Sequence, residues 1–174
     1  MKKLVFIVSL FLISTSFTVS KRIDTLIIKE IKGVFNVEHF EKRSITISNE
    51  LNDNLPLKIT GINFYKVESS ENHLGYYYLG QAYGKADYFD FIVIFDKELM
   101  VSKVKILVYR EDHGGEIGSK RWLKQFIGKV STQNLIYQKD IAAISGATIS
   151  AKAMTNEVNK LLQTIGILIN KQQL

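Results

Sequence analysis

Ser145-Gly146-Ala147-Thr148-Ile149-Ser150 stands between an apolar segment and a stretch with the spacing of an amphipathic helix. Thr148 or Ser150 is expected to serve as the N-cap of this helix, and Gly166 to interrupt it near its end. The apolar residues recur mostly every three or four positions, which places them on one buried stripe: Met154, Val158, Leu161, Leu162 and Ile165.

The turn before this helix has two features of an anion site. Gly146 tolerates a positive φ, and the first amide groups of a helix point outward without partners inside the helix. Such amides can hold a phosphate, and Thr148 would present a hydroxyl beside it. A Ser/Thr-rich turn before an apolar stripe is more often only a capped helix, so the spacing alone leaves both interpretations open.

A second informative stretch runs from Tyr109 to Gly118, with the sequence Tyr-Arg-Glu-Asp-His-Gly-Gly-Glu-Ile-Gly. Three glycines within five positions allow a loop to approach a ligand closely, although a plain surface loop is the alternative. Ser119 is then placed to cap a short helix that buries an apolar group, namely Trp122, Leu123 and Phe126.

In order and separation, the two stretches resemble the FMN-binding domain family, which includes the flavin-carrying subunits of the sodium-pumping quinone reductase and of the related ferredoxin-oxidising membrane complex. The threonine of the family's Ser-Gly-Ala-Thr motif carries FMN through a phosphoester bond, which a separate flavin transferase installs with FAD as donor. The resemblance therefore implies covalent FMN on Thr148. It implies FMN-binding residues in both stretches: Ser145, Gly146, Ala147, Thr148, Ile149, Ser150, Glu111, His113, Gly114 and Gly115.

The chemistry of attachment explains the residue types. A threonine hydroxyl is a weak nucleophile, so activation and any metal must come from the transferase, and the acceptor needs only an uncrowded turn. Gly146 and Ala147 provide that turn for Thr148. A helix N-terminus stabilises an anion by about 0.3–1 kcal/mol at an exposed site, so the covalent bond would do most of the holding.

One position departs from the family pattern. The motif usually has an aspartate three positions before its serine, where this chain has Ala142, while Asp140 lies two residues further upstream. Three consequences stay open: the loop shifts so that Asp140 substitutes, the chain accepts FMN poorly, or it binds FMN without a bond.

Composition limits the other classes of function. The chain of 174 residues is 46% hydrophobic and 23% charged, which suits one globular domain. It has no cysteine, which excludes iron–sulfur clusters, c-type haem attachment, thiol redox chemistry and disulfides, so flavin must carry any electrons. The three histidines, His39, His73 and His113, are far apart, so we expect neither a metal site nor a catalytic triad.

The first twenty residues have the pattern of an export signal. A basic start at Met1-Lys2-Lys3 precedes an apolar run over residues 4–13 and a small, polar stretch over residues 14–20. The apolar part, about sixteen residues, is shorter than the roughly twenty that span a bilayer, which favours cleavage over anchoring. Because family members often keep an N-terminal membrane helix, both remain open for residues 1–20, and residues 21–174 are expected to form an exported, periplasmic or extracytoplasmic FMN-binding domain.

The positive charge does not indicate nucleic acid. The formal net charge is +6, and without Lys2 and Lys3 it falls to +4, from 21 basic and 17 acidic residues. The basic residues are dispersed along the sequence, with Lys120, Arg121 and Lys124 nearest to a patch. An anionic phosphate or a membrane surface suits them better than nucleic acid.

The remaining pattern predicts an α+β fold, an antiparallel sheet with flanking helices. A helix is expected over residues 23–34, ended near Gly33 and Asn36, and tyrosines in the strands are expected to be mostly structural. Strands are expected around residues 44–48, 59–67, 74–83, 89–95 and 103–109, with turns at 51–56 and 96–98.

Three functions follow from these observations. The first is a covalent flavin electron carrier, a redox-complex subunit rather than a stand-alone enzyme, whose partners are the flavin transferase and redox proteins at or in the membrane. The second is a non-covalent FMN-binding protein or flavin reductase component, which Ala142 favours. The third is a non-redox binding module of the cell envelope that only retains the fold.

Overall fold

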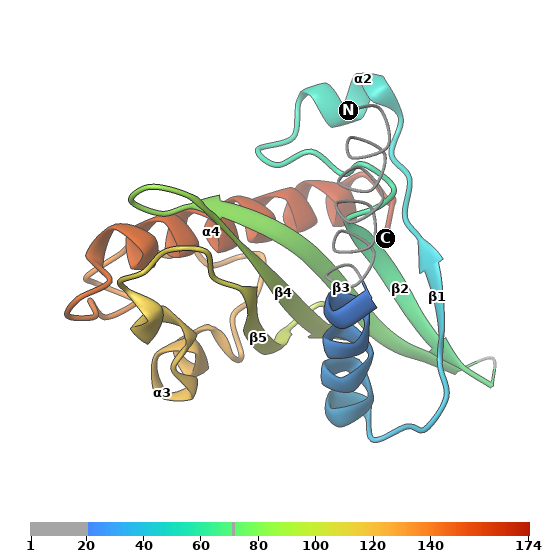
Figure 1. Cartoon of the computed structure of the whole chain (residues 1–174). Coiled ribbons are helices and arrows are strands. Elements are labelled where there is room, and N and C mark those ends of the chain that lie inside the picture. Colours follow the sequence, from blue (N-terminus) through green and yellow to red (C-terminus); the bar gives the residue numbers. More distant parts are fainter. Residues whose placement is uncertain (1–20, 71) are drawn as a thin grey trace, which may run out of the picture.

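The computed structural model describes residues 21–174 except residue 71. Within this part of the chain, a five-stranded antiparallel sheet forms in the order β1-β2-β3-β4-β5, so each strand pairs with its neighbour in sequence (Figure 1). This meander confirms the predicted α+β class. The strands are β1 Glu41–Ser44, β2 Phe64–Ser69, β3 Asn72–Tyr83, β4 Tyr88–Asp96 and β5 Val101–Val108.

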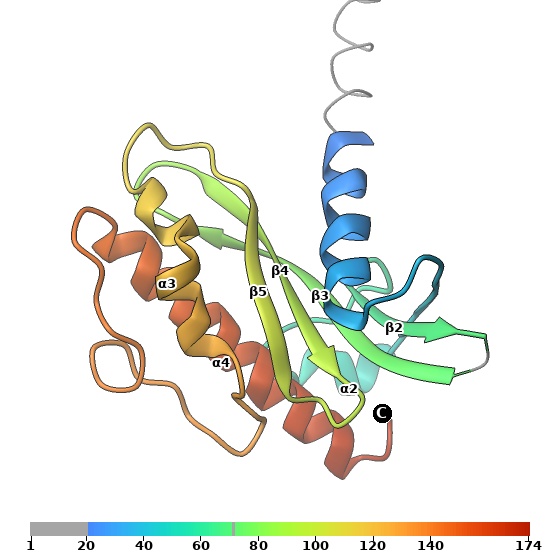
Figure 2. The same cartoon turned by 90° about the horizontal axis from the view of Figure 1, so that it is seen from below.

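Helices cover both faces of the sheet. The long helix α4, Thr148–Asn170, packs on one face, and the helical residues 21–35 lie on the other (Figure 2). The predicted helix over residues 23–34 is therefore confirmed. The short helices are α2 Asn49–Asp53, η1 Gly115–Gly118, α3 Lys120–Leu123 and η2 Lys124–Phe126.

The central strands explain why the sheet needs two covers. Alternate side chains of a strand point to opposite faces, and in β4 both sets are apolar. Phe91 and Val93 join the cluster beneath α4, whereas Ile92 and Ile94 join the cluster beneath the helical residues 21–35. Burial of each such side chain stabilises the fold by about 1.5–3 kcal/mol.

Helix α4 begins and ends differently from the sequence-based expectation. Its N-cap is Ala147, whose side chain makes no capping bond, so the prediction that Thr148 or Ser150 is the N-cap is wrong. Gly166 does not interrupt the helix, which continues to Asn170. A Cβ on Gly166 would lie 3.4 Å from Ser131 Cβ, so this glycine allows close packing inside the helix.

The sequence misplaces elements between the N-terminal helix and β2. Residues predicted as a polar turn begin inside α2, because Ser48 accepts a hydrogen bond from Leu51 N at the helix start. The following residues do not extend β2 back to position 59. There the Asn52 side chain bonds both Ile59 N and Ile59 O, each at 2.8 Å, and this takes the place of strand pairing.

The later strands lie within a few residues of their predicted positions. The turn between β4 and β5 forms as expected, with Asp96 Oδ1 accepting bonds from Glu98 N and Met100 N. The prediction of an export signal or anchor at residues 1–20 falls outside the described residues. In residues 21–174, residue 71 aside, no helix has the length and apolarity to span a membrane.

Candidate functional site

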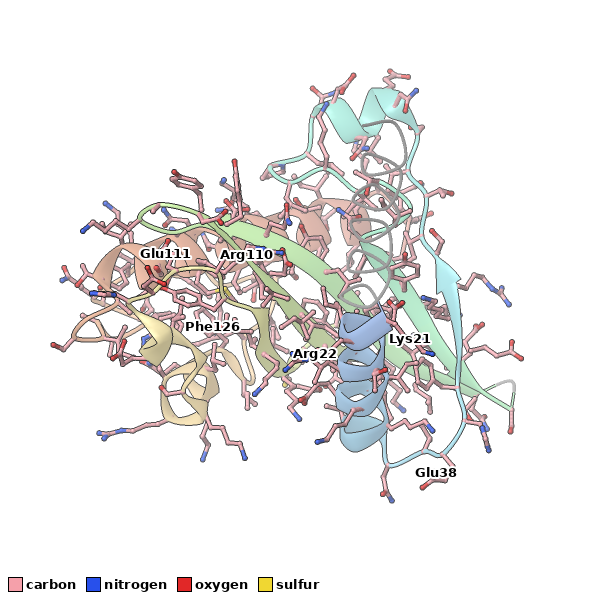
Figure 3. All side chains as sticks on the ribbon, viewed as in Figure 1. Lys21, Arg22, Glu38, Arg110, Glu111 and Phe126 are labelled. Atoms are coloured by element: carbon pink, nitrogen blue, oxygen red, sulfur yellow. The ribbon has the colours of Figure 1, made fainter. Side chains whose placement is uncertain are left out.

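The two motif stretches meet at one end of the sheet, around a cavity of about 310 Å³. Three segments form it: the turn between β3 and β4, the loop after β5, and the start of α4. Figure 3 shows Glu111 at this end of the sheet, beside the first turn of α4. The lining residues are Lys85, Tyr109, Glu111, His113, Gly114, Gly146, Ala147, Thr148, Ile149 and Ser150.

Two of the residues expected to bind FMN do not line this cavity. Ser145 lines a neighbouring cavity of about 610 Å³, together with Ala142 and Trp122. Gly115 is exposed, and a Cβ there would meet no atom within 4 Å. The other eight predicted residues line the 310 Å³ cavity.

Thr148 is the first residue of α4, and its side chain is exposed. The first turn of this 23-residue helix contains no acidic residue, and Ala147 provides no side-chain acceptor for the first amides. Helix N-terminal amides without a cap carry a partial positive charge. The hydroxyl of Thr148 thus stands at a helix start that is open to an anion.

The backbone before Thr148 requires glycine. Gly146 has a φ of +83°, a region that residues with a Cβ rarely adopt, and it passes close to the carboxylate of Glu116. Gly114, on the facing loop, has a φ of +87°, and a Cβ there would lie 2.5 Å from the Tyr109 hydroxyl. Both glycines therefore bring the two loops together at the cavity.

Tyr109 links the loop after β5 to α4. Its hydroxyl donates to His113 O at 2.9 Å and lies 3.1 Å from Ser150 Oγ. Ser150 is buried, so its hydroxyl has a structural partner at the edge of the cavity. Tyr109 was not predicted as a site residue, although it directly follows β5 and begins the second motif stretch.

Glu111 holds the turn between β3 and β4 in place. Its Oε1 accepts hydrogen bonds from Ala86 N at 3.1 Å and Asp87 N at 3.4 Å. Gly84 lies so close that a Cβ there would be 2.0 Å from the same carboxylate oxygen. This turn brings Lys85, which the sequence motifs do not include, into the cavity lining.

Ala142, which stands where the family motif has an aspartate, makes two hydrogen bonds through its backbone. Trp122 Nε1 donates to Ala142 O, and Ala142 N donates to Gln125 Oε1, both at 2.8 Å. Asp140 instead closes its own turn, because its carboxylate accepts a bond from Ile136 N at 2.8 Å. Moving Asp140 into the place of Ala142 would break these bonds.

Folding also brings together basic residues that are dispersed along the sequence. A third cavity, of about 620 Å³, lies between the helical residues 21–35, β5 and the α3–η2 segment. One lysine of this group, Lys103, pairs with Glu30. The lysines that line the cavity are Lys29, Lys103, Lys105, Lys120 and Lys124.

Comparison with known families agrees with this geometry. Residues 84–163 match the FMN-binding domain model, from the turn that carries Lys85 into α4. The chain contains an FMN-binding domain. This confirms the family and the fold expected from the two motifs. No curated protein matches the chain.

The residues of the cavity fit FMN. The FMN-binding domain spans the open helix start, the exposed Thr148 hydroxyl and the close approach of Gly84 and Gly114, three features that suit a phosphate and its chain. Lys85 adds a cation to the lining. Within the described ranges, no three His, Asp or Glu side chains gather as a metal site would require.

Proposed function

We propose that this protein is an exported FMN carrier in electron transfer and that FMN is attached to Thr148 through a phosphoester. The observation that carries the proposal is the place of Thr148 in the FMN-binding domain: exposed, first in α4, and at an uncapped helix start. A buried or capping threonine would not be available for modification.

Attachment requires little from this chain. The Thr148 Oγ1–phosphorus bond forms at the FMN side of the pyrophosphate of FAD, the bond from that phosphorus to the AMP oxygen breaks, and AMP leaves. The hydroxyl proton passes to a base of the flavin transferase. Gly146 supplies the open turn, and the first amides of α4 stabilise the negative phosphate.

Once FMN is bound, its isoalloxazine ring supplies one- and two-electron redox chemistry. The cavity is at the low end of the range of ligand pockets, about 300–1,000 Å³, so part of the flavin would stay accessible to a partner. Exposure suits a carrier that meets redox proteins. The absence of cysteine from the sequence is consistent with flavin as the electron-carrying group.

A second candidate is a non-covalent FMN-binding protein or flavin reductase component. The observation that favours it is Ala142, which lacks the carboxylate of the family motif, while the carboxylate of Asp140 is held by Ile136 N. In that case the same helix start would bind the FMN phosphate without a bond to Thr148.

Co-expression with a flavin transferase separates the two candidates. We expect in-gel flavin fluorescence of the denatured wild type, none for Thr148→Ala, and full fluorescence for Thr132→Ala, which removes another exposed threonine. Fluorescence that persists in Thr148→Ala would exclude this residue as the attachment site. A dark wild type that still retains FMN in its native state would favour the second candidate.

The Ala142→Asp variant sharpens this test. A carboxylate at this position restores the family motif beside Ser145, so we expect labelling to rise relative to the wild type under limiting transferase. Gln125 and Trp122 bond only the backbone of Ala142, and the substitution leaves these bonds in place. Unchanged labelling would show that the aspartate position is unimportant in this chain.

A further inference from the structure

The cavity of about 620 Å³ beside β5, called the lysine cavity below, is separate from the flavin site. Figure 2 shows β5, the last strand in the order of the sheet, between α3 and the helical residues 21–35. No described residue lines both the lysine cavity and the 310 Å³ cavity at Thr148. A ligand of the lysine cavity would therefore occupy a second site.

Three segments that are distant in sequence bring their lysines to this cavity. Lys103 and Lys105 are two positions apart on β5, so their side chains leave the same face of the strand. Lys120 and Lys124 are four positions apart along the α3–η2 segment, a spacing that places them on one side of a helix. Lys29 joins them from the helical residues 21–35.

The positive charge of the lysine cavity is only slightly compensated. Glu30 is the one carboxylate among the lining residues, and it pairs with Lys103. The other four lysines have no carboxylate of the described residues within salt-bridge distance. Five lysines and one glutamate give the lining a formal charge of +4, which equals the net charge of residues 21–174, from 21 basic and 17 acidic residues. The remaining charges of this part of the chain therefore balance.

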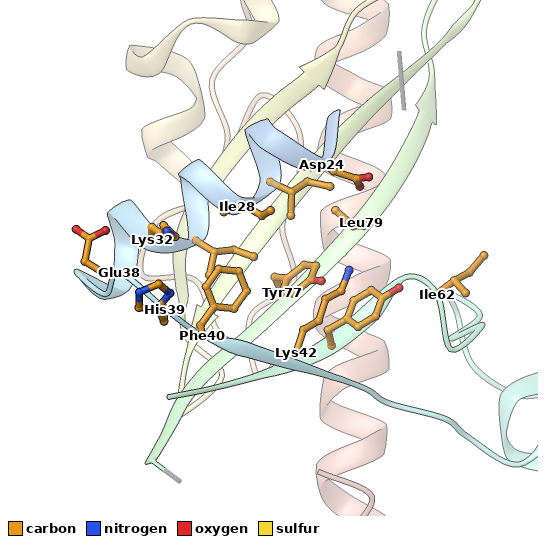
Figure 4. Close-up of a pocket in the computed structure, with 13 residues that line it drawn as sticks. Asp24, Ile28, Lys32, Glu38, His39, Phe40, Lys42, Ile62, Tyr77 and Leu79 are labelled. Atoms are coloured by element: carbon orange, nitrogen blue, oxygen red, sulfur yellow. The ribbon is translucent and has the colours of Figure 1, made fainter. Parts of the chain in front are cut away.

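A groove of about 840 Å³ along another side of the same helix shows that this imbalance is local. Figure 4 shows the charged side chains of the groove, where Asp24 and Glu38 accompany Lys32 and Lys42. Its lining thus has as many carboxylates as lysines. The excess of lysines belongs to the cavity beside β5 and not to the whole surface around the helix.

The charge and the volume of the lysine cavity select the class of ligand. Gathered lysines repel one another, and an anion among them relieves this repulsion. A lysine ammonium binds phosphate as a point charge with three donors. One phosphate group carries about −1.5 to −2 charges at neutral pH, so balancing +4 takes two or three of them. The volume lies within the range of about 300–1,000 Å³ that small-molecule sites occupy.

We propose that the lysine cavity binds a small polyanion with two or three phosphate groups, either a free di- or triphosphate or the phosphorylated headgroup of a lipid. The phosphates lie among Lys105, Lys120 and Lys124, and Ile127, which lines the cavity and is 46% exposed, offers an apolar contact to the organic part. The proposal does not rest on the function proposed for Thr148.

Calorimetry on the purified full chain tests the ligand class. We expect one equivalent of tripolyphosphate to bind, and inorganic phosphate to bind at least about tenfold more weakly, because it meets fewer lysines. Equal affinities would overturn the proposal. Phosphatidylcholine vesicles with and without phosphatidylinositol bisphosphate distinguish the two sources: binding to the bisphosphate vesicles without binding of tripolyphosphate identifies a headgroup. Binding to neither probe would overturn the proposal.

Matched variants locate the site. Lys120→Gln combined with Lys124→Gln should weaken the bound probe at least about tenfold. Lys139→Gln combined with Lys171→Gln removes the same charge from two exposed lysines outside the cavity and should change the affinity less than about twofold. Equal losses in the two pairs would show that the probe responds only to net charge. A loss of the same size in Lys85→Gln would place the probe at the flavin cavity and overturn the proposal.

Glu30→Gln gives a test with the opposite sign. It removes the one carboxylate of the lining and releases Lys103, so we expect the probe to bind about threefold more tightly. Damage to the fold would weaken binding instead, and circular dichroism with the thermal midpoint checks each variant. Unchanged or weaker binding in a folded Glu30→Gln would contradict the proposal.

Discussion

The two helices that cover the sheet differ in how firmly they are held. Helix α4 has ten buried residues, whereas the helical residues 21–35 bury only Ile27 and Ile31. A cavity lies beside each helix. The cavity at α4 lies at its first turn, whereas the cavity at the helical residues 21–35 runs along the side of the helix.

This difference has a consequence for function. Because packing along α4 fixes the helix, its first turn can stay uncapped. The Thr148 hydroxyl is then not needed as a cap and stays available. Light packing of the helical residues 21–35 instead leaves a groove along the helix, lined by the exposed Ile28. Helix α4 therefore fixes the position of a residue at its N-terminus, whereas the helical residues 21–35 leave a groove along their side.

The largest expected effect is the loss of stability when a buried side chain is truncated on each of the two helices. Leu161→Ala on α4 opens a closed cavity in a fully buried site and should cost about 2–5 kcal/mol. Ile27→Ala enlarges a groove that is already open, so only the transfer free energy is lost, about 2 kcal/mol. Urea unfolding measures both values, and a larger loss for Ile27→Ala would contradict the comparison.

A smaller effect concerns the link between the flavin loop and α4. Tyr109→Phe removes the contacts to His113 O and Ser150 Oγ and should destabilise the fold by about 0.5–1.5 kcal/mol. Tyr137→Phe is the matched control, because the buried Tyr137 hydroxyl makes no bond with the described residues. Equal unfolding free energies for the two variants would show that the Tyr109 link does not hold the site.

The smallest expected effect tests the partial positive charge of the uncapped amides at the start of α4. Thr148→Glu places a carboxylate at the first position of α4 and should raise stability by about 0.3–1 kcal/mol relative to Thr148→Gln. The gain should shrink in high salt, because the charge is exposed. A gain that is absent at low salt would mean that the first amides of α4 do not attract an anion.

The sequence predicts those helices and strands whose apolar residues follow a regular pattern. The aromatic and β-branched segments of β3, β4 and β5 and the apolar stripe of α4 appear in the structure because local pattern and tertiary packing agree there. The strand positions near Ile59 could not be predicted, since the Asn52 side chain replaces strand pairing at that point. No periodicity reports such a bond.

The residues that line the 310 Å³ cavity could be predicted only in part from the sequence. Motif residues such as Thr148 and Gly114 stand in the two stretches that the sequence marks out, and the structure brings them together. Lys85 was missed because it comes from a different turn, which Glu111 holds through backbone amides. Ser145 was expected to bind FMN, and it lines the neighbouring cavity, just before the positive-φ turn at Gly146.

The most direct test of the central claim is peptide mass spectrometry of the full chain after co-expression with a flavin transferase and denaturation. We expect the peptide that contains Thr148 to gain the mass of FMN less one water, with fragment ions that place the addition on Thr148. An unmodified peptide from a preparation in which the transferase labels a known acceptor, or an addition at another residue, would contradict the account.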